Sequence, residues 1–281
     1  VYGLAFSRGY LPQTQLWDVT TNFRIDNNNY TPNNYDFKER GPVSLRQALQ
    51  GSLNIPAVEL IYLNGVGRTI DFAEKLGYTG LSDRSRFGLS LALGSAEVRP
   101  IEHASAFATF ANDGVKVPTS AILKVETAEG MLLDEWKQPE GERVIEAQGV
   151  RLLSNVLSDT AARTYIFGAR SSLLTLPDRP VAAKTGTTNS YKDAWTVGYT
   201  PNLATVVWVG NSDGTDMKKG ADGSVIAAPI WNGYMKEAVK SLPKERFKDP
   251  ASSETTNLAL LGQAFFKKLR VDRVSGKLAT D

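Results

Sequence analysis

The sequence contains no cysteine and a single histidine, and both shortages exclude kinds of active site. Without cysteine there is no thiol nucleophile, no disulfide framework and no cysteine-ligated metal. With His103 alone, sites built from several histidines are excluded, and only one Ser-His-Asp arrangement could exist. Any enzymatic chemistry would therefore depend on hydroxyls, lysines, carboxylates or backbone amides.

A strong net charge and a long hydrophobic run are also missing. The 32 Lys and Arg against 30 Asp and Glu leave a net charge of +2, so we expect no nucleic acid and no anionic membrane surface as a partner. The apolar stretches are short or interrupted, and we expect neither a membrane span nor a signal peptide within them. A start at Val1, inside an apolar run, is typical of a fragment or a processed chain.

The order of local patterns predicts an α+β fold. A length of 281 residues, 42% of them hydrophobic, allows one large domain or two small ones with an ample core. Helical patterns dominate the first half, whereas β patterns lie close together at 180–188, 193–200 and 203–211. We therefore predict a short antiparallel sheet beside a mostly helical subdomain.

The two ends of this pattern differ in composition from the middle. Residues 13–42 are rich in Asn, Thr and Pro, which predicts a long ordered loop, and loops of this length are usually functional or disordered. Its aromatic residues Tyr30, Tyr35 and Phe37 predict packing against a surface. The chain becomes polar after Pro243, so we predict a domain over 1–250 and a tail, or the start of a following segment, over 251–281.

Ser52-Leu53-Asn54 lies at a predicted junction of two helices. Ser44 is placed to cap the first helix, whose apolar residues repeat at the spacing of one helical face. That helix ends before Pro56, because the residue before a proline resists helical geometry, and a second helix is predicted to begin there. Taken alone, Ser-x-Asn at such a place is commonly a cap or a turn.

Lys184-Thr185-Gly186-Thr187-Thr188 is the sharpest local feature of the sequence. It ends a predicted strand, places a cation beside hydroxyls, and has at Gly186 a residue without Cβ that another chain can approach closely. Such a strand can bind an extended peptide as an added strand, with lysine and threonine recognising a carboxylate. The alternative is an ordinary strand-to-turn transition, which favours the same residue types.

The order of these two motifs points to one enzyme class. Active-site serine acyltransferases use Ser-x-x-Lys, Ser-x-Asn and Lys-Thr-Gly in that order, and the second and third occur here in that order. Three longer blocks, at 30–60, 91–114 and 181–211, resemble the transpeptidase domain of class A penicillin-binding proteins. The resemblance covers Val1 to Leu242, and the final LRVDRVSGKLATD is similar to the segment that follows this domain in the family.

The resemblance implies a penicillin-binding-protein or serine β-lactamase-like fold and a peptidoglycan D,D-transpeptidase. Such an enzyme cross-links stem peptides through a serine acyl-enzyme, binds β-lactam antibiotics and needs no cofactor. The family also implies an extracytoplasmic location, in the periplasm or on the outer face of the cytoplasmic membrane. In the full-length protein it further implies an N-terminal membrane anchor and a glycosyltransferase domain.

The same resemblance gives roles to the matched residues. Ser52 would relay a proton between the nucleophile and the leaving amine, and Asn54 would hold the substrate amide. Lys184 would maintain a positive field around Ser52. The backbone N–H of Thr187 would supply half of an oxyanion hole. Thr185, Gly186 and Thr187 would form the substrate-binding strand, which binds the terminal carboxylate.

The first family motif has no counterpart in its expected place. The one Ser-x-x-Lys, at 241–244, follows Lys-Thr-Gly, and Pro243 breaks the helical turn that would bring Lys244 onto the face of Ser241. We interpret this segment as a solvated loop. We therefore expect no nucleophile in this chain, and no acyl-enzyme from the chain on its own.

Two alternatives remain at the level of sequence. One is a serine β-lactamase or D,D-carboxypeptidase of the same fold, which hydrolyses its acyl-enzyme with water, although the blocks at 44–58 and 91–100 favour the transpeptidase. The other is a non-catalytic module that binds peptidoglycan or a division partner. We interpret His103 as a packed residue and Asp193 as a hydrogen-bond acceptor, and we expect no metal and no nucleotide.

Overall fold

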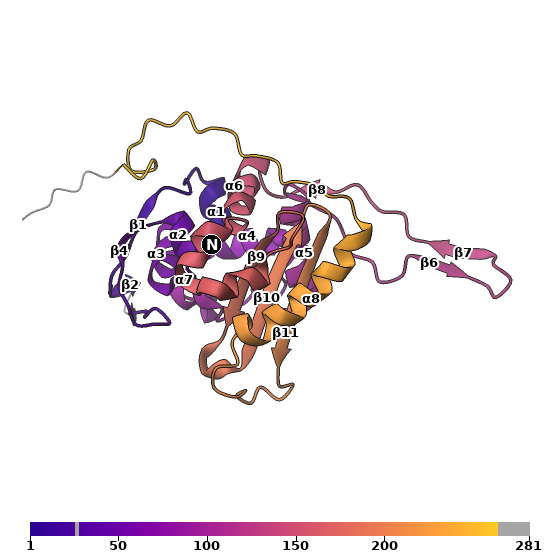
Figure 1. The fold of residues 1–281 in the computed structure, drawn as a ribbon, viewed down its shortest axis with the longest axis horizontal. Coiled ribbons are helices and arrows are strands. Elements are labelled where there is room, and N and C mark those ends of the chain that lie inside the picture. The colour runs from indigo at the N-terminus through magenta and orange to yellow at the C-terminus, as the bar shows by residue number, and fades with distance from the viewer. Residues whose placement is uncertain (26–27, 264–281) are drawn as a thin grey trace, which may run out of the picture.

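The computed structural model describes residues 1–25 and 28–263 (Figure 1). The α-helices of this part are α1 (Tyr2–Ser7), α2 (Leu45–Gln50), α3 (Asn54–Asn64), α4 (Val66–Leu76), α5 (Pro100–Ala111), α6 (Ala147–Leu157), α7 (Thr160–Phe167) and α8 (Ala228–Ala238). Its strands are β1 (Gln15–Asp18), β2 (Phe23–Ile25), β3 (Asn28–Tyr30), β4 (Gly41–Ser44), β5 (Val115–Lys116), β6 (Lys124–Glu126), β7 (Leu132–Glu135), β8 (Glu142–Arg143), β9 (Ala182–Thr187), β10 (Asp193–Thr200) and β11 (Leu203–Gly210). Single helical turns fill several connections.

The predicted antiparallel sheet is confirmed as three strands in the order β11-β10-β9. Because successive side chains of a strand point to opposite faces, the neighbours Ala182 and Ala183 enter different cores. Ala183 packs with Trp231 of α8 on one face, whereas Ala182 joins the larger core formed with α1, α2 and α6 on the other. Figure 1 shows the sheet between α8 and the helical part of the molecule.

The larger core fixes the helical subdomain against the sheet. Leu45 and Ala48 of α2 and Leu60 of α3 are fully buried in it, together with Tyr199 of β10. The predicted cap at Ser44 is confirmed: its hydroxyl accepts from the Gln47 N–H, and the Gln47 side chain accepts from the Ser44 N–H. The junction between α2 and α3 is thereby placed beside β9.

Two local predictions were wrong in part. The segment 13–42 is not free of regular structure, because it contains β1 to β4, and β1 pairs antiparallel with β4. Its residues Tyr35 and Phe37 are 66% and 82% exposed, whereas the polar Asn34 is 3% exposed. The second helix starts at Asn54 rather than Pro56, since a proline is tolerated in the first turn, where its missing N–H is not needed.

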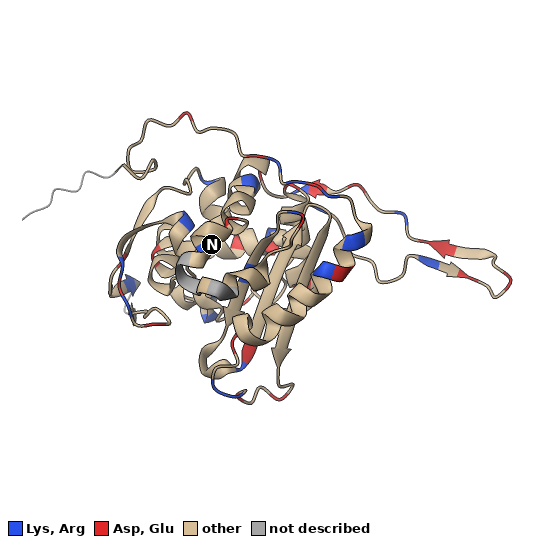
Figure 2. Cartoon of the chain, viewed as in Figure 1, with Lys and Arg blue, Asp and Glu red and all other residues tan. Residues whose placement is uncertain are grey.

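The remaining segments extend from this body. β6 and β7 form an antiparallel hairpin around Gly130 and project away from the domain (Figure 1). After α8 the chain returns along the domain, where the Thr14 hydroxyl donates to the Leu260 carbonyl at 2.8 Å. The boundary near Pro250 stays a prediction, and residues 264–281 lie outside the described part. Charged residues of both signs are scattered along the described chain (Figure 2). Within the described ranges, no helix combines the length and apolarity needed to cross a membrane.

The packing of the sheet against α8 gives a stability prediction. A Cβ on Gly198 would lie 2.4 Å from the Trp231 ring and 2.9 Å from the Ala182 carbonyl oxygen, so Gly198→Ala should destabilise the fold by about 1–3 kcal/mol. The control is Gly233→Ala in α8, where a Cβ meets nothing within 4 Å and should stabilise by up to about 1 kcal/mol. Urea unfolding of both variants measures the difference, and equal stabilities would contradict the packing described.

Candidate active site

A groove of about 630 Å³ lies between the α2–α3 junction, β9 and the loop before β4. Its walls come from segments far apart in the sequence, which the two cores bring together. The lining residues are Asn34, Tyr35, Asp36, Arg40, Gly51, Ser52, Leu53, Asn54, Thr185, Gly186, Thr187, Thr188, Asn189, Ser190, Tyr191, Asp222 and Ser224. All of the predicted site residues except Lys184 are among them, and Lys184 reaches the groove through Ser52.

Ser52 is held in a left-handed conformation, with φ of +52°. It follows α2 at the position where a Schellman motif places glycine: its N–H donates to the Leu49 carbonyl, and the Leu53 N–H donates to the Ala48 carbonyl. A residue with a Cβ is strained there by about 1–2 kcal/mol. Strain of this kind clusters at functional sites, and here it turns the serine hydroxyl toward β9.

Lys184 joins the two halves of the molecule at this point. Its Nζ donates to Ser52 Oγ and to the Thr185 carbonyl, both at 2.7 Å. Burial of the ammonium, with a smaller effect from the positive charge of Arg163, lowers the pKa of Lys184 to about 8. The side chain is thus a cation near neutral pH that can lose its proton in mildly alkaline solution.

Arg163 of α7 is a neighbour that sequence reasoning missed. It is 1% exposed, and burial lowers its pKa to about 10, against the opposing effect of the Asp159 charge. Its guanidinium donates to Gln50 Oε1 and to the backbone carbonyls of Leu157, Leu174 and Ala183. It therefore connects α2 to β9 behind the groove. No pattern in the sequence separated this arginine from the surface arginines.

β9 offers an open edge to the groove, because among the described residues it has β10 on one side and no strand on the other. Thr187 Oγ1 accepts from the Gly223 N–H at 3.0 Å. A Cβ on Gly223 would lie 2.5 Å from the Gly186 carbonyl oxygen, so only glycine lets this segment approach β9. The strand that carries Lys-Thr-Gly is thereby fixed by the segment around Gly223, while its unpaired edge stays accessible.

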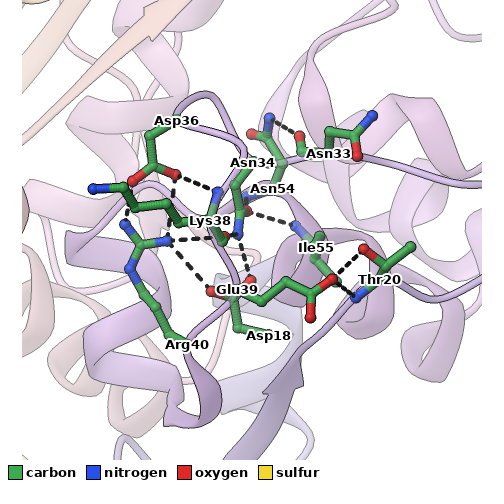
Figure 3. A network of polar contacts seen from close by, with 10 residues as sticks. All are labelled: Asp18, Thr20, Asn33, Asn34, Asp36, Lys38, Glu39, Arg40, Asn54 and Ile55. Carbon is green, nitrogen blue, oxygen red and sulfur yellow. Dashed lines mark hydrogen bonds and ion pairs between the residues drawn. The ribbon is translucent and has the colours of Figure 1, made fainter.

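The far wall of the groove is the loop that precedes β4. The Asn54 N–H and the amide of its side chain both donate to this loop, to Asn34 Oδ1 at 2.9 Å and to the Asn33 carbonyl at 2.8 Å (Figure 3). Across the groove the Tyr35 and Tyr191 hydroxyls lie 3.1 Å apart. The composition of 13–42 indicated a functional loop, but the aromatic residues, not Asn34, were expected to anchor it.

The other residues singled out by sequence lie as follows. Asp193 accepts from the Thr188 hydroxyl and the Trp208 indole N–H, which stabilises the turn after β9. His103 Nδ1 lies 2.6 Å from the Tyr78 hydroxyl, and burial lowers the pKa of this histidine to about 4. Lys244 forms an exposed ion pair with Asp178. None of these is among the residues that line the groove.

The left-handed conformation of Ser52 predicts an order of stabilities. Ser52→Gly and Ser52→Ala both remove the hydroxyl that Lys184 contacts, but only glycine adopts this backbone conformation without strain. Ser52→Gly should therefore be more stable than Ser52→Ala by about 1 kcal/mol. Chemical denaturation of the two variants tests this, and an alanine variant as stable as the glycine variant would show that the backbone is unstrained.

The lowered pKa of Lys184 predicts how stability depends on pH. Between about 8 and the ordinary value of 10.5, the unfolded chain binds a proton that the folded chain has released. The contribution of Lys184 to stability therefore rises with pH across this interval, whereas Lys184→Met has no such contribution. Urea unfolding at a series of pH values should show the wild type gaining relative to the variant, and a constant difference would be the contrary result.

Comparison with known proteins identifies a family for this chain. Residues 2–236 match the family described as "Penicillin binding protein transpeptidase domain". Penicillin-binding protein 1A of Aquifex aeolicus (strain VF5) is 35% identical over 229 residues, which are 82% of this chain and 30% of that protein. Penicillin-binding protein 1A of Neisseria lactamica is 31% identical over 258 residues, which are 89% of this chain and 32% of that protein. The chain thus spans about a third of the length of these relatives.

Solved structures show the same fold. The crystal structure of penicillin-binding protein 1A from Haemophilus influenzae matches with a TM-score of 0.77 at 26% identity, over 89% of this chain and 42% of that one. PonA1 of Mycobacterium tuberculosis in complex with penicillin V matches with a TM-score of 0.73 at 28% identity, over 89% of this chain and 70% of that one. These matches confirm the predicted α+β fold of the penicillin-binding-protein or serine β-lactamase type. The chain belongs to the transpeptidase-domain family of penicillin-binding proteins.

Proposed function

We propose that this chain is the larger part of a serine D,D-transpeptidase domain that cross-links peptidoglycan stem peptides and is acylated by penicillins. The observation that carries the proposal is the contact of Lys184 Nζ with Ser52 Oγ at 2.7 Å, beside the open edge of β9. This contact unites the second and third motifs of the active-site serine enzymes in one groove. The structure of PonA1 with penicillin V, a protein of the same fold, supports the β-lactam as a ligand.

In this proposal Lys184 supplies a positive charge and Ser52 transfers a proton. The Lys184 ammonium donates to Ser52 Oγ, which leaves the serine's own hydrogen for another acceptor. Ser52 can then pass a proton between the attacking serine and the leaving amine, and a lysine pKa of about 8 suits such a relay near neutral pH. Asn54, fixed by the loop, would hold the substrate amide.

β9 would bind the donor peptide. Its open edge can take up an extended peptide as an added strand, with Thr185 and Thr187 directed at the terminal carboxylate. Gly186 lies between them, and its Cβ-less backbone leaves room for that peptide. The Thr187 N–H would form one half of the oxyanion hole, and the N–H of the nucleophilic serine the other.

We propose that the nucleophile lies outside this chain, in a segment of the longer protein that precedes Val1, and that acylation therefore requires the longer protein. The relatives are about three times as long as the matched region. We propose that the full-length protein carries Ser-x-x-Lys, a glycosyltransferase domain and an N-terminal membrane anchor. It would act outside the cytoplasmic membrane, in the periplasm or at the membrane's outer face.

A fluorescent penicillin tests the proposal on the full-length protein. Covalent labelling that survives denaturation is expected, and Lys184→Ala should reduce its rate by about 100-fold or more, since one electrostatic contact to the reacting groups is lost. A polypeptide of residues 1–281 alone should remain unlabelled. A stable label also separates this domain from a serine β-lactamase, which would hydrolyse the penicilloyl-enzyme and release it.

Two outcomes contradict the proposal. Absence of labelling in a folded full-length protein would favour a non-catalytic module of the same fold. Labelling that persists at the wild-type rate in Lys184→Ala would show that acylation takes place elsewhere. The matched control is Lys244→Ala, which removes the lysine of the exposed ion pair with Asp178 and should change nothing.

A further inference from the structure

The first turn of α3 has backbone N–H groups that the helix cannot satisfy by itself. The preceding residue, Leu53, has no side-chain oxygen to cap them, and its own N–H donates back into α2. Pro56, in the third helical position, has no N–H. The two that remain, of Asn54 and Ile55, donate to Asn34 Oδ1 at 2.9 and 3.3 Å (Figure 3). The helix is thus capped by a side chain from a distant loop.

The other end of the Asn34 side chain is equally engaged. Its Nδ2 donates to Asp18 Oδ1 at 2.6 Å and to the Lys38 carbonyl at 2.7 Å. Asn34 is 3% exposed and Asp18 is fully buried, while Arg40 balances the Asp18 charge at 3.4 Å. Because a carboxylate only accepts, the amide nitrogen must face Asp18 and the amide oxygen must face α3. The orientation of this asparagine is therefore fixed.

A second contact ties the same loop to the catalytic motif. The carbonyl of Asn33 accepts from Asn54 Nδ2 at 2.8 Å, which fixes the side chain that lines the groove. Ser52, two residues before, adopts its left-handed conformation within the turn that joins α2 and α3. The α2 end is closed by the hydrogen bonds of the turn itself, and the α3 end depends on Asn34.

We propose that Asn34 is a positioning residue for the Ser52-Leu53-Asn54 turn. Its amide caps α3 and so fixes the first turn of this helix relative to the buried Asp18–Arg40 pair. Without it, the first turn of α3 loosens, and Ser52 and Asn54 leave the geometry that acyl transfer requires. The inference rests on the proposed function, because it assigns Asn34 an effect on the acylation step.

The test measures acylation of the full-length protein by a fluorescent penicillin over a range of concentrations. Asn34→Ala should lower the acylation rate constant by about 10- to 100-fold, with a smaller effect on the half-saturating concentration, because the reacting groups are misplaced while β9 is intact. Asn211→Ala is the matched control. Asn211 is exposed, its side-chain amide donates to the Thr215 carbonyl in its own loop, and it does not line the groove, so this variant should stay within about twofold of the wild type.

An exchange of the two buried partners separates positioning from general stability. Asn34→Asp alone sets two carboxylates at hydrogen-bond distance and should acylate as slowly as Asn34→Ala. The double variant Asp18→Asn, Asn34→Asp keeps the charge of the pair: the carboxylate at 34 accepts from α3 and from the amide at 18, although the hydrogen bond to the Lys38 carbonyl is lost. We expect this exchange to acylate about tenfold faster than Asn34→Asp, because two carboxylates no longer face each other.

The outcomes are distinct. An unlabelled wild type would overturn the proposed function and this inference with it. A labelled wild type together with a folded Asn34→Ala that acylates at the wild-type rate would overturn the positioning role alone. If Asn34→Ala cannot be purified folded, the exchange variant decides: recovery of the rate supports the role, and a stable exchange variant that stays as slow as Asn34→Asp contradicts it.

Discussion

The contact between Lys184 and Ser52 is the one on which the site depends. It joins a strand of the sheet to the end of a helix in the other subdomain, at 2.7 Å. Two separate cores keep these elements in place, and Arg163 connects them from behind. The contact has a cost on each side, since Ser52 is conformationally strained and Lys184 is a partly desolvated cation. Neither the strain nor the desolvation stabilises the fold, so both features are of the kind that is retained for function.

The loop between β3 and β4 supplies what the two motifs lack. Ser-x-Asn stands between two helices, with no side chain of its own to cap the second. Asn34 provides that cap from a network anchored on the buried Asp18, and Asn33 orients Asn54. The loop is irregular in composition because asparagine side chains replace backbone pairing at this place. The loop therefore forms the third wall of the groove and holds the Ser52-Leu53-Asn54 turn, which has no cap of its own.

Sequence patterns predicted the parts of this site whose residues carry a local signal. The strand that carries Lys184, the cap at Ser44 and the three-stranded sheet follow from periodicity and capping chemistry, and the motif order indicated the family. Asn34 and Arg163 could not be found in this way, because their importance lies in partners far along the chain. The loop's aromatic residues suggested burial, yet Phe37 is exposed and the asparagine is buried. Hydrogen bonding, not hydrophobicity, decided which residue points inward.

We propose that Ser52 and Lys184 act as one unit in acylation. A double-mutant cycle measures this directly: the acylation rate constants of Ser52→Ala, Lys184→Met and the double variant of the full-length protein are compared with the wild type. Residues that act together are strongly non-additive, so the double variant should be about as slow as the slower single variant. A double variant whose loss equals the product of the two single losses would show that the residues act independently, and would contradict the account.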